Sequence, residues 1–282
     1  MSEVFRIHRP RQQSAAVVFA SPHSGRAYSA AFLQQTVLDS LTIRSSEDAF
    51  VDELFADAPL FGAPLLLAEV PRAYLDLNRA ADEFDSAVIA GAQRSVHNPR
   101  VASGLGVIPR VVAGGRAIYR GKLSMAEAEQ RVTDVWLPYH GALGQLMDET
   151  HLSFGEAVLL DCHSMPHEAI EGHHRAGAAC PEVVLGDRYG ASANREVVER
   201  VEAAFARAGL RVARNAPFAG AYIAQRYGRP AQGRHVIQIE IDRSLYMHEQ
   251  SLTKRADFDA FRKLINGVIA EVTGEALQMA AE

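Results

Sequence analysis

Two histidines in this sequence follow short apolar runs, a pattern that could bring metal-binding groups together. His23 follows the apolar run 15–20, and His163 follows the run 157–160. A short apolar run followed by small and polar residues is typical of a buried strand that ends in a loop. Strand ends are where an open α/β sheet places its ligands, and imidazole is a common ligand of zinc. We therefore predict that both imidazoles stand at the rim of a sheet and hold a metal ion.

A third candidate residue, Glu240, lies in the alternating segment 235–242. Ile237, Ile239 and Ile241 fall on one face of this predicted strand, so Glu240 falls on the other. A buried carboxylate costs free energy unless it is paired, hydrogen-bonded or used in catalysis. It could bond a neighbouring arginine, or it could act as a general base that accepts a proton from water, and we predict the second role.

The elements that must position these residues alternate along the chain between short apolar runs and longer amphipathic stretches. This alternation predicts an α/β fold with a mainly parallel sheet, and no break in residues 1–282 requires a second domain. The expected helices cover 48–58, with Ser45 and Ser46 as its cap, 124–151, 192–208 and 257–272, and the expected strands cover 15–20, 64–70, 73–77, 157–160 and 235–242.

A long segment without clear periodicity, residues 80–123, follows Arg79 at the end of the predicted strand 73–77. It is rich in Gly, Arg, Asn and Pro. Irregular stretches of this length are more often functional than accidental. We predict that it forms an active-site loop.

Composition excludes several classes of partner. The net charge of −5 comes from interspersed charges of both signs, with no basic stripe and no nucleic-acid-binding motif. No apolar run approaches the length of a bilayer span, and no signal-peptide pattern opens the chain. Cys162 and Cys180 form no CxxC pair. We expect a cytoplasmic protein with a small-molecule partner and neither nucleic acid nor membrane; the sequence sets no oligomeric state.

Six ordered blocks resemble the N-formylglutamate amidohydrolase family. The resemblance extends from about residue 15 to about residue 250, and the blocks are specific in combination although each alone is weak. They are Ser21-Pro22-His23-Ser24-Gly25; Glu47-Asp48 with Val51-Asp52-Glu53-Leu54; Tyr74-Leu75-Asp76-Leu77-Asn78-Arg79; Asp161-Cys162-His163-Ser164; Gly220-Ala221-Tyr222-Ile223 with Arg226-Tyr227-Gly228; and Gln238-Ile239-Glu240.

This resemblance implies a zinc-dependent amide hydrolase that removes formyl groups from N-formyl amino acids such as N-formylglutamate. It also implies a fold similar to the zinc carboxypeptidases, in which a mixed, mainly parallel twisted sheet carries helices on both faces in three layers. Zn²⁺ would then be the cofactor, and Glu240 the base that activates water.

The resemblance also bears on the third metal ligand. In the carboxypeptidases a carboxylate follows the first histidine by three residues, but Arg26 occupies that position here. The family block usually carries an acid at the position of Asp48. We therefore expect His23, Asp48 and His163 as the ligands, with Glu47 as the alternative to Asp48 and Asp161 as the residue that orients an imidazole.

Arginines and tyrosines in these blocks are candidates for contacts with the substrate. Arg79 could steady the developing oxyanion, and Arg226 could bind a carboxylate, because a guanidinium group matches both. Tyr222 and Tyr227 flank Arg226 in a glycine-rich loop and could line the pocket. Arg120, with Lys122, could close over an acidic substrate.

Other function classes remain open from sequence alone. Ser24 or Ser164 could be a nucleophile, although neither lies in a GxSxG motif. The chain could also be a metal-binding protein without turnover, or a hydrolase of another N-acyl amino acid or a small peptide.

Overall fold

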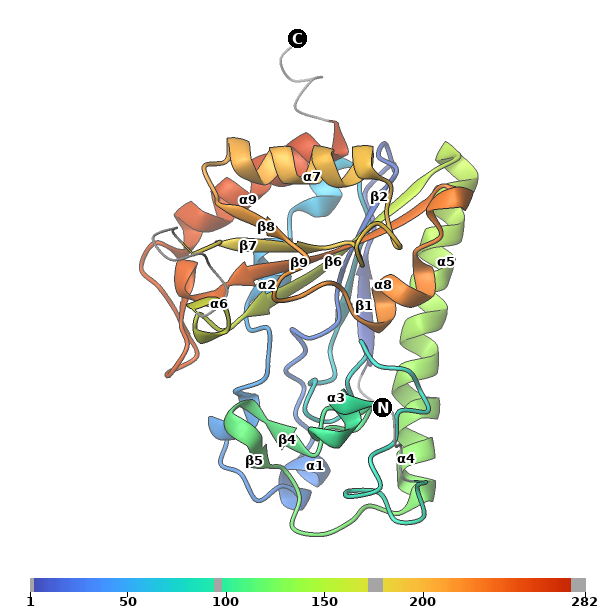
Figure 1. Cartoon of the computed structure of the whole chain (residues 1–282), viewed down its shortest axis with the longest axis vertical. Coiled ribbons are helices and arrows are strands. Elements are labelled where there is room, and N and C mark those ends of the chain that lie inside the picture. The colour runs from blue at the N-terminus through green and yellow to red at the C-terminus, as the bar shows by residue number, and fades with distance from the viewer. Residues whose placement is uncertain (1–2, 94–97, 172–179, 275–282) are drawn as a thin grey trace. The chain divides into compact units, whose positions relative to one another are not determined.

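The computed structural model describes residues 3–93, 98–171 and 180–274. Within these residues the main sheet has seven strands in the order β1-β3-β2-β6-β9-β7-β8. Figure 1 shows the mixed arrangement of helices and strands. The strands are β1 (Phe5–His8), β2 (Val17–Ser21), β3 (Leu65–Ala68), β4 (Val111–Val112), β5 (Arg116–Ala117), β6 (Ala157–Met165), β7 (Val183–Gly186), β8 (Val212–Arg214), β9 (Arg234–Asp242), β10 (Met247–His248) and β11 (Thr253–Lys254). The helices are α1 (Ala30–Gln35), α2 (Val51–Leu54), α3 (Pro99–Ala102), α4 (Met125–Arg131), α5 (Leu137–Phe154), α6 (Glu168–Glu171), α7 (Arg195–Arg207), α8 (Tyr222–Tyr227) and α9 (Phe258–Thr273).

The described pairings confirm a mixed and mainly parallel sheet. β2 with β6, β6 with β9, and β7 with β8 are parallel, whereas β7 with β9 is antiparallel. Every residue of β2, β6 and β7 is buried, as expected for strands covered on both faces. In Figure 1, α7 and α9 lie along one face of these strands and α8 lies on the other.

The chain forms two compact units. The first contains Met1–Arg6, Pro22–Ala49 and Leu67–Ala142, and the second contains Ile7–Ser21, Phe50–Leu66 and Leu143–Glu282. That residues 1–282 form a single domain stays a prediction. Within the described part of the chain, every helix is too short or too polar to cross a bilayer.

A buried arginine holds the core of the first unit together. The Arg131 guanidinium group lies 4.0 Å from the ring centroid of Tyr74 and donates to Tyr119 Oη and to Glu127 Oε1, both at 2.7 Å. Phe32 packs against the same two tyrosine rings. Val112 and Ile118 belong to the same cluster, so it anchors the end of the segment 80–123, of which residues 94–97 lie outside the described residues.

A tight turn fixes where β9 begins. Arg229 and Arg234 exchange backbone hydrogen bonds of 2.7 and 3.2 Å, and Gly233 between them has a φ of +67° that few other residues adopt. The Gly233 carbonyl also accepts from the N–H of Ala157, at the first residue of β6. The register of β9 against β6 is therefore set at its first residue.

Several predicted elements agree with the structure. β2, β3 and β9 fall within or close to the expected strands, and α7 and α9 match the helices expected at 192–208 and 257–272. The helix expected at 124–151 is also present. Ser124 caps it, and a π-helical turn at Val132–Trp136 joins α4 to α5.

The helix predicted at 48–58 is wrong in its extent. Phe50 adopts a left-handed backbone conformation with φ +66°, which cannot continue a right-handed helix, so α2 contains only Val51–Leu54. Neither Ser45 nor Ser46 caps it.

The strand predicted at 73–77 is also wrong. Ala73, Leu75 and Leu77 are buried, but the backbone turns at this point, and the N–H groups of Tyr74 and Leu75 donate to the Pro71 carbonyl. Arg79 therefore lies in a loop and not at a strand end.

Candidate metal centre

His23 lies just beyond the end of β2, as predicted from the sequence. Its loop passes close to a neighbouring segment: a Cβ at Gly25 would lie 2.2 Å from the Val70 carbonyl oxygen, so only glycine fits there. The His23 carbonyl accepts a 3.0 Å hydrogen bond from the N–H of Asp48. This bond ties the segment that carries Asp48 to the one that carries His23.

The buried His23 imidazole lies between two carboxylates. Its Nε2 is 2.7 Å from Asp76 Oδ1, and its Nδ1 is 3.5 Å from Asp48 Oδ2. Asp76 is held in turn by the Arg72 guanidinium group at 3.0 Å. Burial acts to raise the pKa of Asp76, but the charges of His23, Arg72 and Arg79 outweigh it and hold that pKa well below its ordinary value. Asp76 is thus an ionised carboxylate that orients the ring through Nε2.

The His163 imidazole is also oriented by a carboxylate at Nε2, and here the carboxylate lies on the same strand. Asp161 Oδ2 lies 3.0 Å from His163 Nε2, because residues two apart on β6 share a face. This geometry supports the expectation that Asp161 orients an imidazole. The prediction that His163 leaves a strand end is wrong, since β6 continues to Met165.

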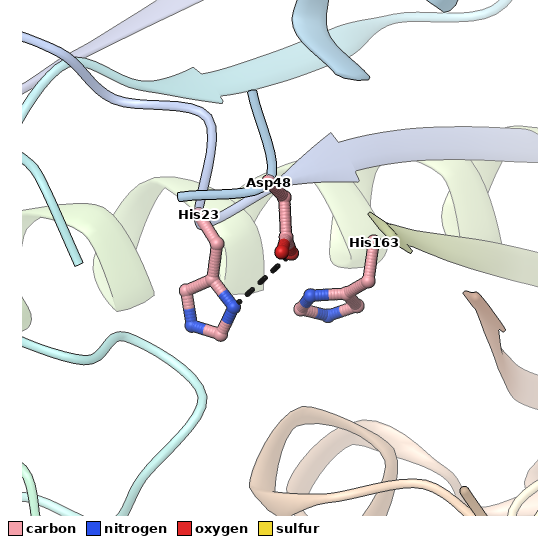
Figure 2. A group of neighbouring side chains, drawn as sticks. All are labelled: His23, Asp48 and His163. Carbon is pink, nitrogen blue, oxygen red and sulfur yellow. Dashed lines mark ion pairs between the residues drawn. The ribbon is translucent and has the colours of Figure 1, made fainter. Parts of the chain in front are cut away.

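The structure brings the three predicted ligands together. One ligand atom from each of His23, Asp48 and His163 lies within 4.8 Å of the other two, and all three side chains are buried. Figure 2 shows the two imidazole rings on either side of the Asp48 carboxylate. Because Nε2 of each ring faces an orienting carboxylate, Nδ1 is the nitrogen left to face a metal ion. Two imidazoles and one carboxylate are a donor set that zinc prefers, so this group fits a metal ion.

Glu47, the alternative third ligand, is engaged elsewhere. Arg44 binds its carboxylate through Nε and Nη2 at 2.9 and 3.0 Å, a two-pronged ion pair. Burial, together with the negative charge of Glu47, raises the pKa of the Tyr28 phenol. This pairing leaves Asp48 as the acid that faces His23.

Glu240 lies on β9 directly beside His163 on β6. The two residues are partners in the parallel register, so their side chains share a face of the sheet. Glu240 is buried, and one of its carboxylate oxygens, Oε1, accepts a 2.8 Å hydrogen bond from Gln238 Nε2. The predicted orientation of Glu240, away from the isoleucine face, agrees with this register.

The predicted substrate residues differ in their surroundings. Arg79 is buried and donates to the carbonyls of Leu105 and Asn78, and burial lowers its pKa. Arg226 is exposed, with its guanidinium carbon 5.9 Å from the Tyr227 ring centroid. Burial raises the pKa of Tyr227 to about 12.

Two further details concern the remaining candidates. The segment from Tyr222 to Tyr227 is the helix α8, so the glycine-rich loop expected there is wrong. Arg120 is exposed, and the neighbouring Lys122 donates to the Ser86 carbonyl. Ser164, one of the possible nucleophiles, accepts from Arg243 Nε at 3.1 Å.

The mixed α/β sheet and the buried group of two histidines and one carboxylate place this chain in the class of proteins that could use a metal ion for hydrolysis. The N-formylglutamate amidohydrolase family model matches residues 15–247. The chain belongs to the N-formylglutamate amidohydrolase family and is an amidohydrolase.

Individual relatives match over nearly the whole chain. The N-formylglutamate deformylase of Pseudomonas putida is 30% identical over 263 residues, which cover 91% of this chain and 90% of that protein. The deformylase of Pseudomonas aeruginosa is 30% identical over 276 residues, covering 95% and 96%. The crystal structure of N-formylglutamate amidohydrolase from Ralstonia eutropha JMP134 superposes with a TM-score of 0.89 at 32% identity, covering 97% of this chain and 98% of that one.

Sequence reasoning missed the roles of Asp76 and Gln238. Asp76 is 53 residues from His23 along the chain, so no local pattern connects the two. The available signal was the position of both residues inside blocks that carry the family resemblance, at Asp76-Leu77-Asn78-Arg79 and Gln238-Ile239-Glu240.

Proposed function

We propose that this chain hydrolyses the amide bond of an N-formyl amino acid, with N-formylglutamate as the first candidate and other N-acyl amino acids as the broader class. The observation that carries the proposal is the buried group of His23, Asp48 and His163 with Glu240 beside His163 in the sheet. The names of the relatives from both Pseudomonas species support the choice of substrate.

We assign zinc to the His23, Asp48 and His163 group. When bound, zinc polarises the amide carbonyl and makes water more acidic, so hydrolysis needs no nucleophilic side chain. Asp76 and Asp161 hold the two rings through Nε2, so Nδ1 of each ring would bind the ion.

Glu240 is the general base in this proposal. Its carboxylate accepts a proton from the attacking water and passes it to the leaving nitrogen. For N-formylglutamate the carbon–nitrogen bond breaks, the water oxygen ends in formate, and the nitrogen leaves as the amino group of glutamate. Burial keeps bulk water from competing for the carboxylate.

Cationic and aromatic side chains provide the substrate contacts. We assign Arg79 to the developing oxyanion, and Arg226, Tyr222 and Arg120 to the carboxylates of the amino acid. An arginine fork binds a carboxylate in two-pronged geometry, which selects an acidic substrate over a neutral one.

The two neighbouring acids before α2 should respond differently to truncation. Asp48→Ala removes a ligand, so metal affinity should fall at least 100-fold. Glu47→Ala removes the partner of Arg44 and leaves the donor set intact, so it should destabilise the fold more than it lowers metal content. Equilibrium dialysis and thermal unfolding measure the two effects. The reverse order of metal loss would show that Glu47 is the ligand.

The proposed activity is tested with metal-loaded enzyme and a panel of N-formyl, N-acetyl and larger N-acyl amino acids, before and after chelation. We expect formate release to be fastest with N-formylglutamate, to stop on chelation and to return with zinc. Undiminished turnover after complete metal removal would indicate a serine hydrolase. Tight metal binding with no turnover on any member of the panel would indicate a binding protein.

A further inference from the structure

Gln238 lies between the start of α8 and the side chain of Glu240. It is buried on β9, two residues before Glu240 and on the same face of the strand. Its Oε1 accepts from the N–H of Ala221 at 3.0 Å, and its Nε2 donates to Glu240 Oε1 at 2.8 Å. One amide side chain therefore links the residue just before α8 to Glu240.

The chemistry of the two partners fixes how the Gln238 amide is oriented. The N–H of Ala221 is only a donor, so it requires the amide oxygen of Gln238. The NH₂ group must then face Glu240 and donate to its Oε1. A proton on Oε1 directed at Gln238 would clash with this donor, so the hydrogen bond favours the carboxylate form. Gln238 thus fixes the orientation of the Glu240 carboxylate through Oε1.

Two glycines allow the backbone of Ala221 to come close enough to Gln238. Gly186 on β7 is the register partner of Gln238, and a Cβ at Gly186 would lie 2.6 Å from the backbone nitrogen of Gly220. Gly220 itself has a φ of +103°, a conformation that disfavours other residues. The segment is fastened further by the N–H of Arg188, which donates to the Ala219 carbonyl at 2.7 Å.

We infer that Gln238 is a positioning residue that sets the orientation of Glu240 and couples it to α8. The inference rests on the proposed role of Glu240 as the base. Tyr222 and Arg226, which we assign to the substrate, lie on α8 immediately after Ala221. The two hydrogen bonds of Gln238 therefore link the helix that carries these residues to the carboxylate that takes the proton.

Two variants test the two hydrogen bonds of Gln238. Gln238→Glu keeps an acceptor for Ala221 but puts a second carboxylate where Glu240 expects a donor. Gln238→Met fills a similar volume and removes both hydrogen bonds. We expect kcat to fall about 10- to 100-fold in both, the range found when a residue that orients a functional group is lost. KM and zinc content should change less than threefold.

Gln232→Glu is the matched control, because it makes the same chemical change at an exposed position just before β9. It should leave kcat and KM at their wild-type values. Thermal unfolding of each variant establishes that it is folded. If Gln238→Glu does not fold, Gln238→Met alone decides the outcome.

A double-mutant cycle with Glu240→Gln distinguishes positioning of the base from general structural support. If Gln238 acts through Glu240, Gln238→Met should lower kcat in the wild-type background and have little effect where Glu240 is already replaced. An equal loss in both backgrounds, or wild-type kcat in folded Gln238→Met, overturns the inference. Wild-type kcat in Glu240→Gln would instead overturn the proposed base.

Discussion

Replacing either His23 or His163 by alanine should abolish metal binding and hydrolysis together. Each variant leaves only one imidazole and one carboxylate, which is too few protein ligands for a catalytic zinc site. Metal content after dialysis, measured by elemental analysis, should fall to near zero. Zinc should raise the melting temperature of the wild type but not of either variant, since a ligand that does not bind cannot stabilise the folded state.

An exposed histidine provides the control for this experiment. His8→Ala in β1 removes an exposed imidazole that is not part of the group of His23, Asp48 and His163, and it should keep full metal content and activity. Retention of a full equivalent of zinc by both His23→Ala and His163→Ala would refute the metal centre. Loss of activity with metal retained would mean that the histidines act in some other way.

Glu240→Gln should keep the fold and the metal while losing turnover. The amide oxygen of the new side chain still accepts from Gln238, so the hydrogen bond that holds the residue survives. The group that takes up a proton is gone. Because a positioned base contributes about 10²–10⁴-fold, kcat should fall by about that factor with a much smaller change in KM.

A glutamate on the surface provides the control for Glu240→Gln. Glu196→Gln on the exposed side of α7 should behave as the wild type in every assay. Steady-state kinetics at several substrate concentrations separates kcat from KM, and zinc content is measured on the same samples. A variant that unfolds or loses its metal would make Glu240 a structural residue or a ligand, and near-wild-type kcat would place the base elsewhere.

The parts of the fold that could be predicted are those in which local periodicity and tertiary packing agree. β9 and α9 carry strong alternation or helical spacing, and both are present. At 73–77 the apolar residues Ala73, Leu75 and Leu77 are buried, but buried apolar residues do not show whether a partner strand exists.

The end of β6 shows the opposite kind of error. Polar residues after the apolar run suggested a loop, yet the strand continues, because its backbone pairs with β9 as far as Met165 opposite Asp242. Within β6 itself, Asp161 lies 3.0 Å from His163, so polar side chains two residues apart can pair on a buried strand. No pattern within this segment shows that a partner strand is present, since β9 begins only at Arg234.

For the candidate site, the metal ligands could be predicted better than the residues that orient them. His23, His163 and Asp48 came from strand ends and a family block, and the structure brings them together. Asp76, which holds His23, could not be identified, because its role depends on a contact across 53 residues of chain.

Because of the turn before β9, the number of residues between Gly233 and Glu240 matters to this site as much as their identity. Side chains alternate between the two faces of a strand, so adding or deleting one residue between Gly233 and Glu240 would move Glu240 into the isoleucine layer. The hydrogen bonds between Arg229 and Arg234, and the one from Ala157 to Gly233, would keep the strand from sliding back to compensate. Such an insertion or deletion would inactivate the enzyme even if every catalytic residue were still present. Length changes compatible with function should therefore be found before the turn and not within the strand.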